Sequence, residues 1–237
     1  MSTIKKKGYT AKDHQEQEIV TIARKVLDTL SEYKQSLLIA AAAVAAVLVI
    51  TAGYSLYQSA QEQKAAPLLA AAIEYYVPSG AAGADYQRAL DMFRDIQKKY
   101  SGTKSGAIAQ YYIGNCLVNL GKPDEALSAY SAFTNKYAGE KLLLSLVYQR
   151  MGYVYITLGK QADALKAFEQ AETVGGPSVA TVELARMYEA SGNIPEAQKK
   201  YKQVMEKLGG TTWAMEAMGK VQAITPATQP PVGTSGK

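Results

Sequence analysis

The chain has 237 residues, with 26 Lys and Arg against 21 Asp and Glu, one His and one Cys. This length allows one or two domains, and the lone cysteine, Cys116, excludes an internal disulfide and a zinc site built from several thiolates. The lone histidine, His14, excludes a paired-histidine metal motif and argues against a Ser-His-Asp triad. The composition therefore favours a protein that is not an enzyme and predicts no catalytic residue, metal ion or cofactor.

The first 34 residues are predicted to form a cytoplasmic arm with one amphipathic helix, which begins near Asp13. Apolar side chains recur there at steps of three and four and form one stripe: Ile19, Ile22, Val26, Leu30 and Tyr33. The stripe either packs on a partner or lies on a lipid surface. The alternative is that the helix of the arm is only an amphipathic continuation of the helix that follows it. The run Lys5 to Lys7 has no aromatic platform beside it, so no nucleic-acid partner is expected.

The next segment, residues 35–61, has no charged residue between Lys34 and Glu62. Because an α-helix rises about 1.5 Å per residue, roughly 20 apolar residues cross the ~30 Å hydrocarbon core of a bilayer. Ser36 to Tyr57 is long enough, which predicts a single transmembrane anchor. The alternatives are a buried Ala-rich helix of a soluble domain, although such helices seldom stay uncharged this long, and a cleaved signal peptide, whose apolar run is shorter at ~7–15 residues.

Basic residues are distributed unevenly around this segment, since only Lys64 follows it closely while several precede it: Lys5, Lys6, Lys7, Lys12, Arg24, Lys25 and Lys34. This asymmetry predicts a cytoplasmic N-terminus and places the residues after Glu62 across the membrane. In a bacterium this is a single-pass protein of the inner membrane with its larger part in the periplasm. Small residues four apart favour close approach of the anchor to another helix or to a second copy in a homo-oligomer: Ala41, Ala42, Ala45 and Ala46.

Residues 62–224 contain a repeated pattern of small and aromatic residues. In three segments a small residue is followed 12 positions later by Ala and, four positions after that, by an aromatic residue: Gly114, Ala126 and Tyr130; Gly152, Ala164 and Phe168; Ala185, Ala197 and Tyr201. This spacing resembles the tetratricopeptide repeat, which is a pair of antiparallel helices. The resemblance implies an all-α fold in which the N-terminal transmembrane helix is followed by an α-solenoid of about three and a half to four hairpins.

Each helical pair carries local signals for its turn. Gly121, Gly159 and Gly192 are expected to end the first helices, where a residue with positive φ caps the last turn. Pro123 and Pro195 are expected near the start of the second helices, where the missing N–H costs nothing. These signals agree with the pairing that the repeat predicts.

The two ends of the repeat region are irregular. Ala89 and Phe93 fit the second helix of a first pair, and the first helix of that pair is expected to end near Tyr76. Residues 212–224 are expected to form a lone capping helix that covers the last hairpin. The tail, residues 225–237, is rich in Pro, Gly, Thr and Ser and is expected to be disordered.

As a whole, the chain resembles the YfgM-like family in its short N-terminal arm, single membrane anchor and tetratricopeptide domain. The resemblance implies an ancillary subunit of the SecYEG translocon that works with periplasmic chaperones on emerging chains. The partners then expected are translocon subunits, periplasmic chaperones or unfolded clients, besides membrane lipid. The tail after Ile224 is an extension that the family pattern does not include.

In a tetratricopeptide superhelix the first helices line the concave face, which predicts a protein-binding groove made of Tyr111, Asn115, Val118, Asn119, Gln149, Tyr153, Ile156, Thr157, Val182, Arg186 and Glu189. Tyrosines, amides and aliphatic side chains suit adaptable contact with extended or partly folded segments. Asn115 matches an asparagine of the carboxylate-clamp subset of the family, but the accompanying lysines are missing, which argues against recognition of a free C-terminus. The alternative is that these residues are merely solvated helix faces.

Two functions remain open from the sequence. The leading one is a membrane-anchored module that holds or hands over secreted polypeptides near the Sec translocon. The other is a structural scaffold that assembles a different envelope complex for the cell wall, secretion or respiration. An enzyme is disfavoured because ligands and bases are missing, and Cys116 is expected to be a small buried hydrophobe.

Overall fold

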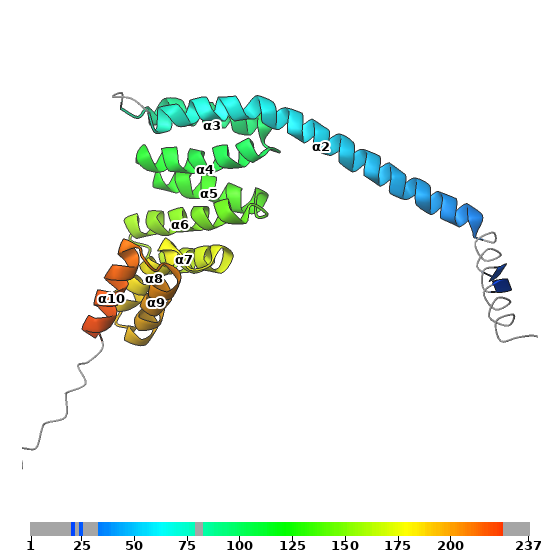
Figure 1. The fold of residues 1–237 in the computed structure, drawn as a ribbon. Coiled ribbons are helices and arrows are strands. Elements are labelled where there is room, and N and C mark those ends of the chain that lie inside the picture. The colour runs from blue at the N-terminus through cyan, green and yellow to red at the C-terminus, as the bar shows by residue number, and fades with distance from the viewer. Residues whose placement is uncertain (1–19, 22–23, 26–32, 79–82, 225–237) are drawn as a thin grey trace, which may run out of the picture. The chain divides into compact units, whose positions relative to one another are not determined.

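The computed structural model describes residues 20–21, 24–25, 33–78 and 83–224 (Figure 1). These residues form helices and turns, and none of them lies in a strand, which confirms the predicted all-α fold. The helices in chain order are α2 (Lys34–Tyr76), α3 (Tyr86–Tyr100), α4 (Lys104–Asn119), α5 (Pro123–Lys136), α6 (Lys141–Thr157), α7 (Gln161–Gly175), α8 (Val179–Ala190), α9 (Ile194–Lys207) and α10 (Thr212–Ile224).

Parts of three predictions fall outside the described residues. The first concerns most of the apolar stripe of the arm, namely Ile19, Ile22, Val26 and Leu30. The other two concern the region around His14 and the tail, residues 225–237. The last member of the stripe, Tyr33, lies in the turn that precedes α2. The helix of the arm and the disorder of the tail stay predictions.

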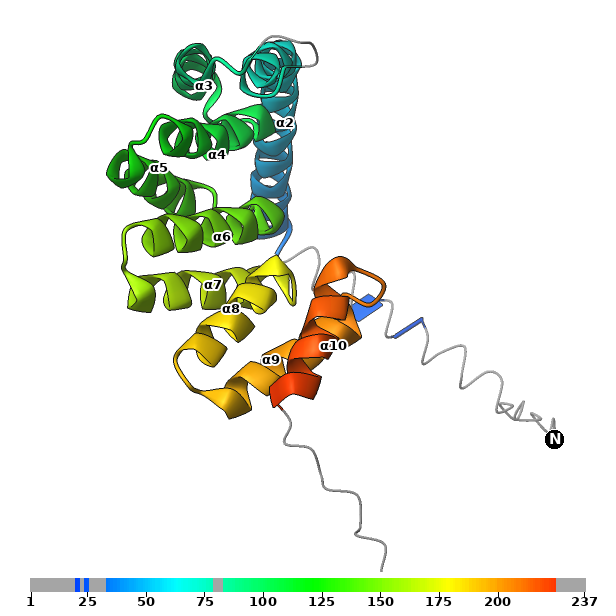
Figure 2. The ribbon, with the colours of Figure 1, turned by 90° about the vertical axis from the view of Figure 1, so that its left-hand side faces the viewer.

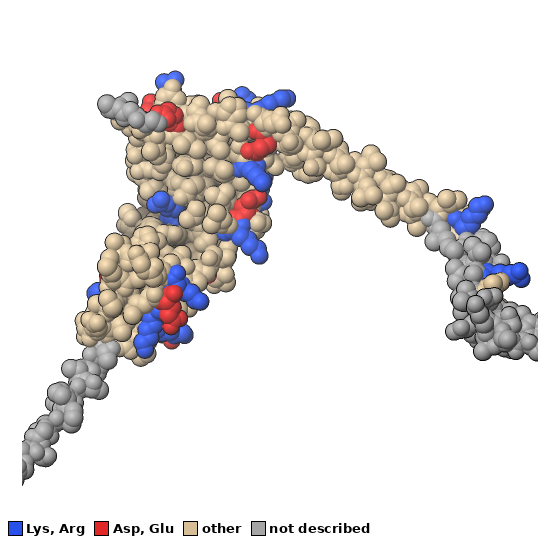
Figure 3. Space-filling view, viewed as in Figure 1, with Lys and Arg blue, Asp and Glu red and all other residues tan. Residues whose placement is uncertain are grey.

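Helix α2 contributes to both of two compact units, Met1–Tyr57 and Gln58–Lys237. In the first unit its large apolar side chains are exposed, as Val49 and Leu56 illustrate at 72% and 73%. After Lys34, this stretch has no charged residue as far as Tyr57, and Figure 3 shows it as an uncharged surface. Among the described residues, α2 is the helix that is long and apolar enough to cross a membrane.

In the second unit, consecutive antiparallel helices pair and stack on one another (Figure 2). The C-terminal part of α2 packs with α3, and α4, α6 and α8 pack with α5, α7 and α9, respectively. Helix α10 packs on α9 and α8 and has the bounds expected for a capping helix. The first helix of the first pair ends at Tyr76, where the sequence places its end.

A glycine with positive φ fixes the turn between the two helices of the last three pairs. Gly121, Gly159 and Gly192 have φ values of 72°, 71° and 77°, in a region that a Cβ atom disfavours. After the first of these turns, the N–H of Lys122 donates to the carbonyl of Leu117 at 2.8 Å, and equivalent bonds close the other two turns. These bonds satisfy the last carbonyl groups of each first helix, so the predicted helix ends are confirmed.

Gly114 and Gly152 lie where the two helices of a pair meet. A Cβ atom at Gly114 would lie 2.2 Å from the nearest ring carbon of Tyr130, and one at Gly152 would lie 2.7 Å from the ring of Phe168. Both rings are fully buried. The spacing from small residue to aromatic residue therefore has a steric basis, because each ring fills the space that the missing side chain leaves.

Candidate functional site

A pocket of about 180 Å³ opens on the surface formed by the first helices of the hairpins. We call it the arginine pocket, because Arg150 is the one charged residue in its lining. The end of α2, the helices α4 and α6, and one residue of α5 contribute the lining: Tyr76, Asn115, Val118, Asn119, Tyr130, Arg150, Tyr153, Val154 and Thr157.

Five of the residues predicted for the groove meet in this pocket: Asn115, Val118, Asn119, Tyr153 and Thr157. The first three lie on α4 and the last two on α6, and these helices contact each other although α5 separates them in the chain. The first helices of successive hairpins thus share a surface, as the repeat pattern predicts.

Hydrogen bonds hold the two asparagines of the pocket in place. The hydroxyl of Tyr130 donates to Oδ1 of Asn115 at 2.6 Å. Nδ2 of Asn119 donates to the hydroxyl oxygen of Tyr76 at 3.2 Å and to the backbone carbonyl of Asn115 at 2.9 Å. Within the described part of the chain, the Nδ2 group of Asn115 donates no hydrogen bond, and it is not a fully buried atom, so it is open to solvent in the pocket.

The guanidinium of Arg150 lies at the same pocket with few partners of its own. Its Nε donates to the hydroxyl oxygen of Tyr111 at 3.4 Å. Among the described residues, no carboxylate lies within ion-pair distance of it. An arginine keeps its charge at any physiological pH, so the pocket carries an unneutralised positive charge.

Aromatic rings pack behind the polar lining. Tyr112 meets Tyr76 edge-on at 5.0 Å and Tyr111 edge-on at 5.4 Å, and it stacks on Phe93 at 5.0 Å between ring centres. Burial raises the pKa of Tyr76 and of Tyr112. Both phenols therefore keep their protons at neutral pH, and the hydroxyl of Tyr76 remains a hydrogen-bond donor.

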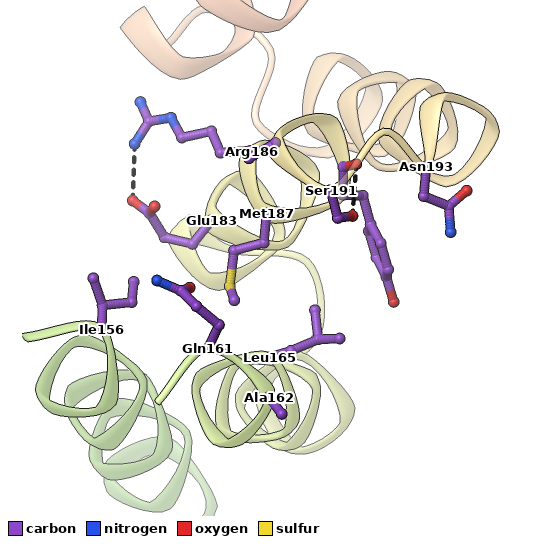
Figure 4. A pocket seen from close by; sticks show the side chains of 11 residues that line it. Ile156, Gln161, Ala162, Leu165, Glu183, Arg186, Met187, Ser191 and Asn193 are labelled. Atoms are coloured by element: carbon purple, nitrogen blue, oxygen red, sulfur yellow. Dashed lines mark hydrogen bonds and ion pairs between the residues drawn. The ribbon is translucent and has the colours of Figure 1, made fainter. Parts of the chain in front are cut away.

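A larger pocket of about 700 Å³, which we call the inter-hairpin pocket, lies between the α6–α7 hairpin and α8 (Figure 4). Its lining includes two residues predicted for the groove, Ile156 and Arg186, and is otherwise formed by Gln161, Ala162, Leu165, Glu183, Met187, Tyr188, Ala190, Ser191 and Asn193. The hydroxyl of Tyr153, in the arginine pocket, donates to Glu183 at 3.2 Å. The two pockets are therefore neighbours.

Two predicted groove residues on α8 are engaged by the capping helix. Arg186 donates to both carboxylate oxygens of Glu216 on α10 at 2.9 and 2.6 Å, and to Glu183 at 2.8 Å. Glu189 accepts a hydrogen bond from Lys220 of α10 at 2.9 Å. Hydrogen bonds from Arg186 lower the pKa of Glu216, so this pair remains charged at neutral pH. Helix α10 thus occupies this end of the predicted groove.

The three remaining groove residues line neither pocket. Val182 is 1% exposed and belongs to a core cluster with Ala217 of α10, so its predicted place on the surface is corrected by the structure. Tyr111 is also buried, at 9% exposure, and reaches the arginine pocket only through its bond with Arg150. Gln149 is half-buried on α6.

Cys116 is fully buried on α4, which confirms its predicted role as a small hydrophobe. Burial raises the pKa of its thiol to about 12, so the reactive thiolate is scarcely populated at neutral pH. Over the described ranges, no group of three or more His, Cys, Asp or Glu residues is arranged to hold a metal ion.

Arg150 is not among the residues predicted for the groove, although its position in the repeat carries a signal. Arg150 lies two residues before the small residue of its repeat, Gly152. The equivalent residues in the preceding and following repeats are Tyr112 and Glu183, and both also lie at the pockets or directly behind them. This repeat position was therefore a usable indicator of the groove.

Comparisons with known proteins identify the fold and the family. The sequence matches a family model, a tetratricopeptide repeat-like domain, over residues 30–224, which includes the apolar part of α2. No curated protein matches the sequence.

The structure is similar to a tetratricopeptide repeat protein from Parabacteroides merdae, with a TM-score of 0.55, 14% identity, and coverage of 68% of this chain and 60% of that one. It also matches the MamA protein, with a TM-score of 0.48, 16% identity, and coverage of 59% and 73%. At 14% identity, the similarity to the Parabacteroides merdae structure supports the fold alone.

Tetratricopeptide-like domains are protein–protein interaction modules. The helical hairpins, their glycine turns and the match over residues 30–224 place the chain in the tetratricopeptide repeat-like domain family.

Proposed function

We propose that this protein is a membrane-anchored binding module that holds extended or partly folded polypeptides on the surface formed by its first helices. The observation that carries the proposal is the pair of neighbouring pockets on that surface, of about 180 and 700 Å³. Their linings combine tyrosines, amides and apolar side chains, and such residues give contact area at modest entropic cost. The flexible Met187 side chain adds an adaptable apolar contact.

The apolar part of α2 supports the membrane anchor in this proposal. Its side chains are exposed within the first unit, and an exposed apolar helix of this length is unfavourable in water. The excess of Lys and Arg before residue 35 supports a cytoplasmic N-terminus and a repeat domain across the membrane. The small residues of the span, Ala41, Ala42, Ala45 and Ala46, are proposed to contact a neighbouring transmembrane helix.

The site of action that we propose is the periplasmic side of a bacterial inner membrane, beside the Sec translocon and together with chaperones. The resemblance of the whole architecture to the YfgM-like family supports this assignment. Emerging chains expose extended apolar and polar segments, which fit the chemistry of the two pockets. A scaffold for another envelope complex is the competing function, and it predicts one fixed partner instead of many clients.

Two arginines in the middle of the apolar segment, Val47→Arg with Leu48→Arg, are expected to release the protein from membranes. Each arginine at the centre of a transmembrane helix costs about 2.5–3.5 kcal/mol on insertion scales. The measurement is carbonate extraction of membranes followed by immunoblotting of pellet and supernatant. The control is Ser128→Arg on the exposed surface of α5, which should leave the protein in the pellet. A parent protein found in the supernatant would refute the anchor.

Photo-crosslinking from Asn119 and Thr157, which are exposed and line the arginine pocket, is expected to capture many different secreted chains and translocon or chaperone subunits. These positions are preferable to Tyr111, which is buried. Mass spectrometry of the adducts is the measurement, and Ser128 on α5 serves as the control position, from which few adducts should form. A single stoichiometric partner outside the secretion machinery would instead identify a scaffold.

A further inference from the structure

The arginine pocket contains more free hydrogen-bond donors than free acceptors. Arg150 uses Nε for Tyr111, which leaves four N–H groups of its fork without a partner in the described part of the chain. Asn115 accepts from Tyr130 through Oδ1 and keeps both hydrogens of Nδ2. The hydroxyl of Tyr76 accepts from Asn119 and keeps its own proton to donate.

The acidic group nearest to this pocket in the hydrogen-bond network is already occupied. Glu183 accepts hydrogen bonds from Tyr153 at 3.2 Å and from Arg186 at 2.8 Å. None of the nine residues that line the arginine pocket is acidic. Arg150 is exposed, so its charge is solvated in the free protein and open to an acidic group of a ligand.

A ligand that only accepts hydrogen bonds matches this set of donors. An ionised carboxylate has two oxygens and no proton to donate, and the planar guanidinium can bind both oxygens with parallel N–H groups. Such charge-assisted bonds are stronger than bonds between neutral groups. A volume of about 180 Å³ has room for one side chain and not for a folded surface.

Apolar surface continues from the pocket in two directions. On α6, Leu142 and Leu146 precede Arg150 at steps of four residues, so all three share one helix face. The two leucines are aliphatic, yet Leu142 is 78% exposed and Leu146 is 39% exposed. On the other side lies the inter-hairpin pocket with Ile156 and Met187. A chain that contacts both apolar regions passes through the arginine pocket with an internal residue, not with its end.

We propose that Arg150 selects a glutamate or aspartate side chain within an extended, otherwise apolar or neutral segment of the bound polypeptide. This inference rests on the proposed function and adds charge selectivity to it. Asn115 and Tyr76 assist as donors, and the apolar surfaces on both sides bind the flanking side chains. The missing lysines of a carboxylate clamp serve to bind the free C-terminus of a chain. They are not required here, because the carboxylate belongs to a side chain within the segment.

The test uses the full-length protein in detergent micelles and fluorescent twelve-residue peptides of Leu, Ala and Ser with blocked ends. One peptide carries a central Glu and its partner a central Gln, and binding is followed by fluorescence anisotropy. We expect the Glu peptide to bind about 5- to 30-fold more tightly, since one to two charge-assisted bonds to a half-open site correspond to such a ratio. Arg150→Gln should remove this preference, and added salt should weaken it.

Matched variants keep the outcome interpretable. Arg94→Gln removes an exposed arginine of α3 and should leave the preference unchanged. Val118→Glu places a carboxylate at the rim of the pocket, where it should pair with Arg150 and abolish the preference. Val118→Gln adds a side chain of the same size without the charge, so it should weaken both peptides by the same factor and keep the ratio between them. Val118 is 41% exposed, so neither change disturbs the core and the pair serves even if Arg150→Gln fails to fold.

Three results would overturn the inference while leaving the proposed function intact. The first two are equal binding of the Glu and Gln peptides and a preference for Glu that survives Arg150→Gln. The third needs one more peptide, the Gln peptide with a free C-terminal carboxylate, and is tighter binding of this peptide alone. The last of these would assign the pocket to chain ends. If no peptide binds and crosslinking also finds no client, the proposed function itself fails.

Discussion

Phe168→Ala is expected to destabilise the repeat domain by about 3–5 kcal/mol. The ring of Phe168 is fully buried between the two helices of the α6–α7 hairpin, lies against Gly152 and meets the ring of Tyr153 edge-on at 5.2 Å. Alanine removes these contacts and leaves a cavity that the rigid helices cannot close. This loss is a large part of the ~5–15 kcal/mol that stabilises a typical domain.

The measurement for Phe168→Ala is urea unfolding of the full chain in detergent, followed by circular dichroism at the helical band. The shift of the midpoint multiplied by the slope gives the change in the free energy of unfolding. Met215→Ala is the control, because this side chain of α10 is 61% exposed and its loss should change stability by less than about 0.5 kcal/mol. Equal stability of the two variants would contradict the packing described for the α6–α7 hairpin.

Gly152→Ala is expected to destabilise the domain by about 1–3 kcal/mol, through overpacking. This sign is opposite to the usual effect, since replacing a helical glycine by alanine normally stabilises a helix by about 1 kcal/mol. The added Cβ would lie 2.7 Å from the ring of Phe168, so the ring or the helix must move. Gly219→Ala is the matched control, because a Cβ there meets nothing within 4 Å, and the usual stabilisation is expected.

The double variant Gly152→Ala with Phe168→Ala tests the steric cause directly. Once the ring is absent, the new methyl group enters a cavity, so Gly152→Ala should become stabilising in the Phe168→Ala background. Urea unfolding of the four proteins of this cycle gives the coupling free energy, which we expect to be favourable by more than about 1 kcal/mol for residues in direct contact. Additive effects would show that the ring does not limit residue 152.

The repeat geometry could be predicted from the sequence because its signals are local. Gly152 and Phe168 are 16 residues apart, and their spacing follows from the length of one helical pair. The same holds for the glycine of the turn, Gly159, whose positive φ is required wherever the first helix ends. The glycine turn recurs in the last three pairs, so one chain contains several examples of it.

The candidate site could be predicted only in part, because its residues depend on contacts between pairs. Counting along the helices assigns Asn115 and Tyr153 to the groove, and both line the arginine pocket. The role that we propose for Arg150 depends on the absence of an acidic neighbour among the described residues, which no spacing in the sequence reveals. The burial of Val182 depends on α10, whose position against α8 is fixed by side-chain pairs such as Arg186 with Glu216, 30 residues apart.

The ion pairs between α8 and α10 also hold the last described helix against the array. Helix α10 lies where the first helix of an additional hairpin would have to pack, and Arg186 and Glu189 fasten it there. Lengthening the array by duplication would require new partners for both residues as well as a new hairpin. Within the described residues, α10 therefore covers the α8 end of the surface formed by the first helices, and a ligand on that surface has the hairpins before α8 to contact.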